Sequence, residues 1–132
     1  HSSPRRQRQM CIRDSIAAGE PIEALENPEM VDIPSSLLHP DNYVLQVKGN
    51  SMIDEQIHDK DYIVARKTNT ARSGQIVVAL INGEATLKYY IHGPEGVELH
   101  PRNPDFPIIK VDSKDDFHIN GVLLYSFRNY LN

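Results

Sequence analysis

Seven short apolar segments separated by polar turns dominate this chain from residue 43 onward. They cover residues 43–48 (YVLQVK), 62–67 (YIVARK), 75–81 (QIVVALI), 85–91 (ATLKYYI), 96–100 (GVELH), 107–111 (PIIKV) and 117–127 (FHINGVLLYSF). Asn82-Gly83 lies between two of them, and an Asn-Gly pair in that setting predicts a β-hairpin. Because no helical pattern separates the segments, we expect a mainly β domain of short, coiled antiparallel strands, with one helical turn near residues 52–56.

Composition limits the classes of protein that this sequence can encode. The 132 residues are 39% hydrophobic and 24% charged, which suits one soluble globular domain. No apolar run approaches the roughly 20 residues that a membrane-spanning helix needs, so we expect no membrane contact. A single cysteine excludes a disulfide framework and a cysteine-based zinc site. The histidines are scattered without metal-ligand spacing, so we expect no metal ion and no cofactor.

The first fifteen residues, HSSPRRQRQMCIRDS, contain four arginines and no hydrophobic period. They suit a basic disordered tail or a nucleic-acid-binding arm, but residues 5–15 also match the translation of a common transposase-based sequencing adapter. We therefore interpret residues 1–15 as non-native and leave them out of the fold. The remaining chain has ten basic and seventeen acidic residues, a net charge of −7. Such an acidic domain is a poor nucleic-acid binder on its own.

Residues 16–42 differ in character from the β-type region that follows. Three prolines interrupt residues 16–38, and small, acidic and aliphatic residues alternate there. This pattern favours an extended arm or linker, with room for one short strand, over a helix. We therefore divide the chain into a non-native segment (1–15), an arm (16–42) and a folded domain (43–132).

Gly49-Asn50-Ser51-Met52 follows directly on an apolar segment, where the chain has to turn. Glycine permits unusual backbone angles there, and a serine in such a turn exposes its hydroxyl beside free backbone N–H groups. Taken alone, the motif equally suits an ordinary turn or a helix N-cap.

Lys88 lies inside the apolar segment 85–91, where strand alternation places Thr86, Lys88 and Tyr90 on one face. Most lysines in such a position extend into solvent. A buried lysine instead has a lowered pKa, and its neutral amine can serve as a general base toward a hydroxyl nucleophile. In the arm, Ala17, Ala18 and Gly19 are small enough for close backbone approach, although they also suit a flexible linker.

Together these features resemble one protein family. The matching segments are IAAGEPIEALENPE (16–29), VLQVKGNSMIDEQIHDKDYIVARK (44–67), GQIVVALINGEATLKYY (74–90) and ELHPRNP (98–104). They are similar to the C-terminal self-cleaving, S24-type peptidase domain of the LexA family of SOS-response repressors and of its UmuD-like relatives. The resemblance covers residues 16–128 and implies a LexA/signal-peptidase-like fold preceded by an extended cleavage arm.

The resemblance also implies a function and a set of site residues. Ser51 matches the nucleophile, Lys88 the general base, and Ala18 and Gly19 the two sides of the scissile bond. We add that the backbone N–H groups of Ser51 and Asn50 would form the oxyanion hole. The implied partners are a RecA filament on single-stranded DNA and a second copy bound through the C-terminal region. DNA would be bound only through a missing N-terminal helix-turn-helix domain, in a bacterial cytoplasm.

Other interpretations remain open at this point. A UmuD-like subunit of a translesion polymerase has the same dyad, but segment 16–26 resembles the LexA linker more closely. A temperate-phage repressor shares the fold. A signal peptidase has a related site but needs a membrane anchor, for which these residues hold no apolar segment. A β domain without activity, used for dimerisation, is the alternative from a different class of protein.

Overall fold

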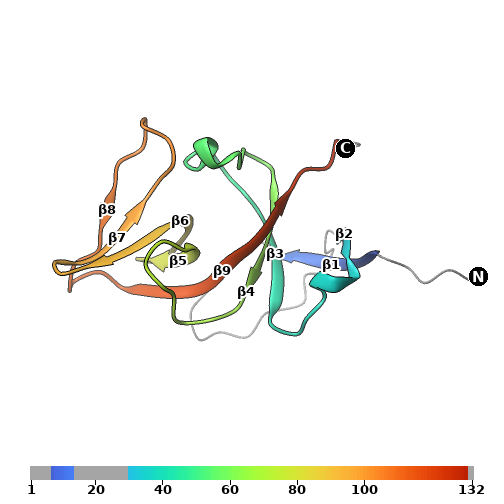
Figure 1. Cartoon of the computed structure of the whole chain (residues 1–132), viewed down its shortest axis with the longest axis horizontal. Helices are drawn as coiled ribbons and strands as arrows, with labels where there is room; N and C mark the ends of the chain where they lie inside the picture. Colours follow the sequence, from blue (N-terminus) through green and yellow to red (C-terminus); the bar gives the residue numbers. More distant parts are fainter. Residues whose placement is uncertain (1–6, 14–29, 131–132) are drawn as a thin grey trace, which may run out of the picture.

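A computed structural model of the chain describes residues 7–13 and 30–130 (Figure 1). The regular elements of these residues are nine strands and two short 3-10 helices. They are β1 (Gln7–Arg13), β2 (Met30–Pro34), η1 (Ser35–Leu37), β3 (Asn42–Gln46), η2 (Ile53–Glu55), β4 (Tyr62–Arg66), β5 (Ile76–Ile81), β6 (Glu84–Gly93), β7 (Gly96–His100), β8 (Ile109–Lys110) and β9 (Phe117–Phe127). The predictions of a mainly β fold and of a helical turn near residues 52–56 are thereby confirmed, whereas η1 was not predicted.

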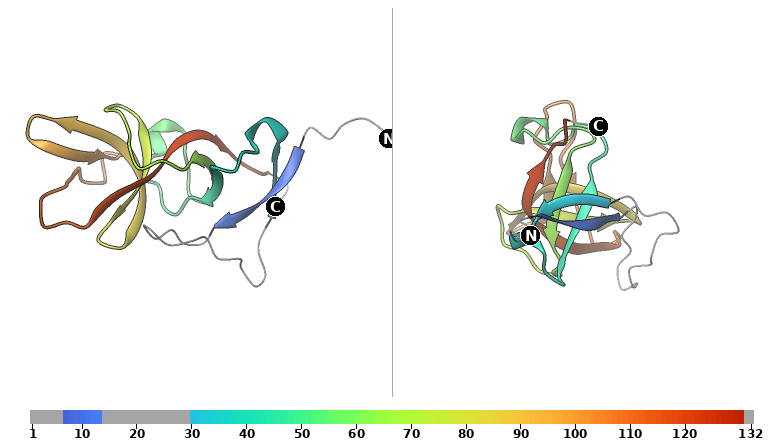
Figure 2. Two further views of the ribbon diagram at one scale, coloured as in Figure 1. Left: turned by 90° about the horizontal axis from the view of Figure 1, so that it is seen from below. Right: turned by 90° about the vertical axis from the view of Figure 1, so that its right-hand side faces the viewer.

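All nine strands belong to one sheet, in the order β2-β1-β3-β4-β9-β5-β6-β7-β8. The long strand β9 pairs with β5 through its first half and with β4 through its second half. It runs diagonally across the molecule in Figure 1 and joins the β5–β8 half to the β1–β4 half, as the views in Figure 2 also show. Irregularities at Val64/Ala65 and Val78/Ala79 shift the register. Such bulges increase the local twist and so allow one strand to serve both halves.

The turn between β5 and β6 has the conformation that its sequence predicts. Asn82 and Gly83 both have positive φ angles, of 51° and 86°. Two consecutive positive φ angles define the type I′ turn, whose twist matches that of the flanking strands. The antiparallel pairing of β5 with β6 brings Lys88 opposite Val77.

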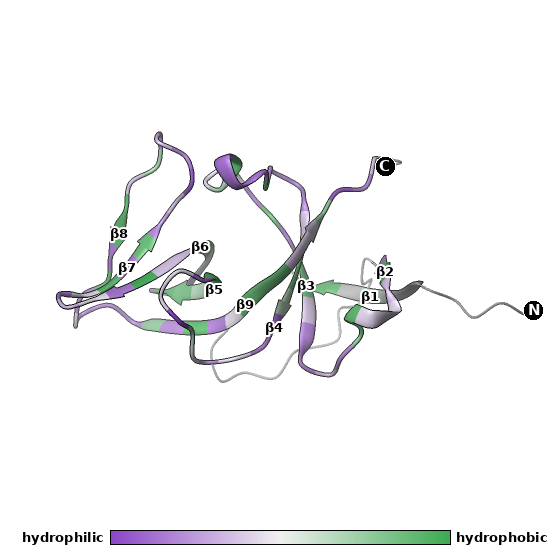
Figure 3. Cartoon of the chain, in the orientation of Figure 1, coloured by the Kyte–Doolittle hydropathy of each residue, from purple (hydrophilic) through white to green (hydrophobic). Residues whose placement is uncertain are grey.

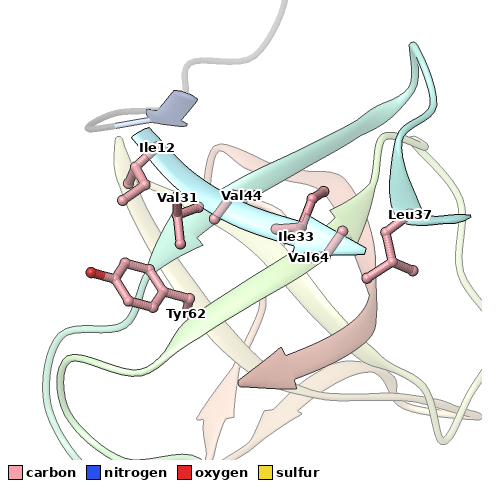
Figure 4. Close-up of a cluster of buried hydrophobic side chains, with 7 residues drawn as sticks. All are labelled: Ile12, Val31, Ile33, Leu37, Val44, Tyr62 and Val64. Atoms are coloured by element: carbon pink, nitrogen blue, oxygen red, sulfur yellow. The ribbon is translucent and has the colours of Figure 1, made fainter. Parts of the chain in front are cut away.

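In two places the sheet extends beyond the predicted folded domain. Residues 1–15 were left out, yet β1 pairs with β2 and, in parallel, with β3. Ile12 is 4% exposed and belongs to the cluster of buried side chains drawn in Figure 4. A strand needs only backbone hydrogen bonds and an apolar residue at its inward positions, and Met10 and Ile12 supply the latter. The parallel β1–β3 pairing also departs from the all-antiparallel prediction.

The predicted boundary between arm and domain also lies too late in the chain. Val31, Ile33 and Leu37 are buried in the same cluster (Figure 4), and Asn42 already belongs to β3. The short strand allowed for in the arm is β2. Alternating apolar residues drive Met30–Pro34 into the sheet despite the prolines around it, because Val31 and Ile33 point to the same face.

Two further apolar clusters fill the rest of the molecule. One packs β5, β6, β7 and β9 together, with Val77, Ala79 and Leu99 fully buried. The other, which contains Tyr43 and Val78, lies between the two halves. Figure 3 shows hydrophobic colour along β5 and the middle of β9, and hydrophilic colour in the turns.

Candidate active site

The turn that carries Ser51 follows β3 and is hydrogen-bonded to the segment of residues 58–61. Gly49 has a φ of 85°, a left-handed conformation that favours glycine. Its N–H donates to Asp59 Oδ1 (2.7 Å), and the Asp59 N–H donates to Asn50 Oδ1 (2.9 Å). Met52, the residue after Ser51, is 2% exposed and anchors the turn in the interior. The serine is therefore held between the hydrogen-bonded turn at Gly49 and the buried side chain of Met52.

An ion pair supports the segment to which this turn is fastened. Asp61 is 3% exposed, and Arg128 Nη2 donates to its Oδ2 over 2.9 Å. The Arg128 hydrogen bond holds the pKa of the Asp61 carboxyl below its usual value. The same Oδ2 accepts a hydrogen bond from the His58 N–H (2.8 Å). Asp61 thus connects the end of β9 to the segment beneath the serine turn.

Lys88 lies on β6 and is buried, with 6% of its surface exposed. Its Nζ lies 2.9 Å from Ser51 Oγ, although the two residues are 37 positions apart in sequence. The amine also lies 2.6 Å from Thr86 Oγ1 and 3.2 Å from the carbonyl oxygen of Leu87. The structure thus brings together the two residues that the sequence suggested as nucleophile and base.

The two other contacts of the amine orient it toward the serine. A neutral lysine amine has two N–H groups and one lone pair. The Leu87 carbonyl can only accept a hydrogen bond, and the Thr86 hydroxyl can accept the second. The lone pair is then directed at Ser51 Oγ, the position from which it can take the hydroxyl proton. The arrangement suits general-base catalysis.

Burial lowers the pKa of Lys88 from 10.5 to about 8, because an ammonium group is poorly solvated in this interior. Among the described residues, no carboxylate lies within ion-pairing distance of its Nζ. At pH 7 about a tenth of the lysine is therefore neutral, against less than about a thousandth for a lysine in water.

This burial makes a prediction for stability. Below pH 8 the lysine is protonated in both the folded and the unfolded chain, and its buried charge destabilises the folded chain. This destabilisation disappears as the pH rises through 8 toward the unfolded pKa of about 10.4. In a Ser51→Ala background, Lys88→Met should therefore raise the free energy of unfolding at pH 7 by about 2 kcal/mol. Urea unfolding should show this gain shrinking by about pH 10. A gain that is equal at both pH values would contradict a buried, titrating lysine.

Three residues of the site were not predicted as site residues, although the sequence did place one of them, Thr86, beside Lys88. Thr86 shares the face of Lys88, and this i, i+2 relation was the available signal. Arg102 and Asn103, in the loop between β7 and β8, contact the serine turn from a distant part of the chain, and no local pattern announces such a contact. The Arg102 N–H donates to the carbonyl oxygen of Ser51 (2.7 Å), and Asn103 Nδ2 donates to that of Asn50 (2.8 Å).

A second group of side chains joins η2 to β6 beside the dyad. The Tyr89 hydroxyl donates to Glu55 Oε1 (2.9 Å), and the Arg102 guanidinium lies 4.0 Å from the centroid of the Tyr89 ring. Because Tyr89 is adjacent to Lys88 and Glu55 belongs to η2, these contacts help to fix the distance between the lysine and the serine turn.

The remaining predicted site residues have different outcomes. Asn50 lies in the serine turn, directly before Ser51. Ala18 and Gly19 lie outside the described residues. Within residues 7–13 and 30–130 no group of three metal-ligating side chains comes together. No helix in that part of the chain is long and apolar enough to cross a membrane.

Comparison with known proteins assigns the chain to a family. The model of the Peptidase S24-like family matches residues 10–124, most of the chain. The chain belongs to the Peptidase S24-like family. Its relatives within the family include proteins named LexA repressor. Examples are the proteins of Syntrophotalea carbinolica (42% identical over 120 residues), Pseudothermotoga lettingae (50% over 120) and Erythrobacter litoralis (44% over 121).

The matches extend over most of this chain but over only part of each relative. They cover 90%, 88% and 90% of this chain, and 59%, 60% and 52% of the three repressors respectively. The chain thus spans between half and two thirds of the length of these S24-like relatives. The part of the chain that the family model matches contains both Ser51 and Lys88.

Proposed function

We propose that this chain is the self-cleaving part of a LexA-like SOS-response repressor, in which Ser51 and Lys88 cut the bond between Ala18 and Gly19. One observation carries the proposal: the Nζ of buried Lys88 lies 2.9 Å from Ser51 Oγ in a member of the Peptidase S24-like family. The similarity to proteins named LexA repressor supports the repressor role.

The proposed reaction follows from these positions. Neutral Lys88 takes the proton of the Ser51 hydroxyl as Oγ attacks the carbonyl carbon of Ala18. The tetrahedral intermediate collapses, the bond to the Gly19 nitrogen breaks, and the lysine ammonium returns a proton to the departing amine. Water, deprotonated by Lys88, then hydrolyses the ester between Ser51 and Ala18 and regenerates the serine.

The oxyanion of the intermediate needs hydrogen-bond donors. Among the described residues, none accepts a hydrogen bond from the Ser51 backbone N–H, so this group is available as a donor. An N–H at the nucleophile itself is a common element of oxyanion holes, and each donor contributes about 100- to 1000-fold to the rate. We therefore assign the Ser51 N–H as the principal donor and the backbone N–H of the neighbouring Asn50 as the second donor.

Tethering the substrate to the enzyme makes strong substrate binding unnecessary. An intramolecular reaction has a high effective molarity, provided the arm reaches the dyad. The small side chains of Ala17, Ala18 and Gly19 would allow the arm to approach Ser51 closely. Cleavage would separate the peptidase domain from any DNA-binding domain ahead of the arm, and would thereby end repression.

Such a reaction needs a restraint and a trigger. Protonation of Lys88 restrains it, because most of the lysine is charged at neutral pH. A partner that stabilises the docked arm would shift the population toward cleavage. By resemblance that partner is a RecA filament on single-stranded DNA, and the repressor would act in the bacterial cytoplasm as a dimer joined through its C-terminal region. DNA would be bound only through a helix-turn-helix domain outside this sequence.

A cleavage assay with the RecA filament tests this regulation directly. RecA assembled on single-stranded DNA with a nucleotide should raise the self-cleavage rate of the chain at about pH 7 by about tenfold or more, which corresponds to a typical coupling between two sites. RecA without DNA is the control and should leave the rate unchanged. Equal rates with and without the filament, in a chain that cleaves itself at higher pH, would contradict the repressor function while leaving the peptidase intact.

We further propose that residues 1–15 are not native to the gene. The match of residues 5–15 to an adapter translation supports this origin. The formation of β1 is compatible with it, because backbone groups make the sheet hydrogen bonds whatever the side chains are. Met10 and Ile12 then occupy inward positions that native apolar residues would otherwise fill.

A further inference from the structure

The loop between β7 and β8 holds the two peptide groups that flank the serine side chain. Asn103 Nδ2 donates to the Asn50 carbonyl oxygen over 2.8 Å, and the Arg102 N–H donates to the Ser51 carbonyl oxygen over 2.7 Å. The Arg102 carbonyl in turn accepts a hydrogen bond from the Asp54 N–H (2.8 Å). Two consecutive residues of a distant loop thus hold both carbonyls next to the nucleophile.

The contact to Asn50 also fixes the direction of the proposed oxyanion donor. The Asn50 carbonyl and the Ser51 N–H belong to one planar trans peptide, so they point in opposite directions. The Asn50 oxygen accepts the short bond from Asn103 and a longer one, 3.3 Å, from the Ile53 N–H. With the oxygen held in this way, the Ser51 N–H is directed away from the loop and cannot rotate independently. A hydrogen bond to the carbonyl also polarises the peptide and strengthens its N–H as a donor.

The orientation of the Asn103 side chain is itself determined by the loop. Its Oδ1 accepts a hydrogen bond from the Asp105 N–H (2.9 Å), which leaves Nδ2 to face Asn50. Pro101, Pro104 and Pro107 are spaced along the same loop, and their fixed φ angles reduce its freedom. The amide is therefore presented to the serine turn by a stiff support.

We propose that Asn103 is a positioning residue for the reaction, which acts through the Asn50–Ser51 peptide to aim the Ser51 N–H at the oxyanion. The assignment rests on the proposed function of Ser51 as nucleophile. It adds a specific role for a side chain that hydrogen-bonds to neither Ser51 Oγ nor Lys88.

Asn103→Asp tests this role with little change to the loop. The carboxylate keeps the acceptor for the Asp105 N–H but places an oxygen, in place of a donor, against the Asn50 carbonyl. We expect the limiting rate of self-cleavage at high pH to fall about 10- to 100-fold, because the donor is misaligned rather than removed. The new carboxylate favours the charged form of Lys88, so rates are compared on the high-pH plateau, where the lysine is neutral in both chains.

The matched control is Asn82→Asp in the turn between β5 and β6. There too an asparagine Nδ2 donates across the surface, to Asp115 Oδ1 (3.0 Å), while its Oδ1 accepts a backbone N–H, that of Asp116 (3.0 Å). The same chemical change in this turn should leave both the limiting rate and the midpoint unchanged.

A second measurement does not depend on cleavage. In amide NMR spectra of the Ser51→Ala chain, which stays intact, Asn103→Asp should move the resonance of the residue 51 amide and leave that of Lys88 in place, whereas Asn82→Asp should move neither. An unmoved residue 51 amide or a limiting rate within twofold of the parent would each overturn the positioning role. If the parent chain does not cleave itself at all, the proposed function fails, and the amide resonance alone decides the placement of the Asn50–Ser51 peptide.

Discussion

Replacing either Ser51 or Lys88 with alanine is expected to abolish cleavage between Ala18 and Gly19 while the domain stays folded. Ser51 forms the acyl bond, and Lys88 is the one base within reach of its hydroxyl among the described residues. Loss of either residue removes a group that acts only as a unit with the other, so each variant should lose about 10⁴-fold or more in rate. Intact-mass measurements over time at high pH follow the disappearance of the full-length chain.

Two exposed residues provide the matched controls for these variants. Ser113 lies in the turn before β9 and Lys110 on β8, and both are exposed. Ser113→Ala and Lys110→Ala make the same chemical changes as the site variants but should cleave at the parent rate. Cleavage by Lys88→Ala at more than about a hundredth of the parent rate would show that another group serves as the base.

The pH dependence of cleavage has the second-largest expected effect. Only the neutral form of Lys88 can accept the serine proton, and its pKa is about 8. The rate should therefore rise about tenfold per pH unit below pH 8 and level off above it, so that cleavage at pH 6 is about a hundredfold slower than at the plateau. First-order rates of self-cleavage over this range measure the profile. A flat rate between about pH 7 and pH 10 would rule out Lys88 as the base.

Chemical replacement of the lysine tests the same assignment without an overall change of pH. A Cys11→Ser, Lys88→Cys chain can be alkylated with bromoethylamine while unfolded and then refolded, because Cys11 is the single cysteine of the sequence. The product carries an amine of lower basicity at position 88. Its midpoint should move to lower pH relative to lysine. An unchanged midpoint would mean that the observed titration belongs to another group.

The β framework was largely predictable from sequence because its signals are local. Segments such as 62–67 and 117–127 alternate or are uniformly apolar, and turn residues end them, so β4 and β9 appear close to their expected bounds. The Asn82-Gly83 turn needs positive φ angles, which these residue types tolerate. The strand β1 was missed because its stability comes from backbone pairing and from the burial of Ile12, which the composition of residues 1–15 does not reveal.

The site shows the same division between local and distant signals. The segment around Ser51 and the strand of Lys88 were found by their motifs, but the pattern could not tell whether the face of Lys88 is covered. Burial, which lowers its pKa, is a property of the assembled sheet. The contacts of Arg102 and Asn103 likewise depend on where the β7–β8 loop lies after folding.

The mass of the purified chain after incubation at about pH 10 tests the central claim most directly. The account predicts two fragments, residues 1–18 and 19–132, whose masses place the cut between Ala18 and Gly19, and their absence from the Ser51→Ala and Lys88→Ala chains. A chain that remains intact, or a cut at another bond, would contradict self-cleavage of the arm by this dyad.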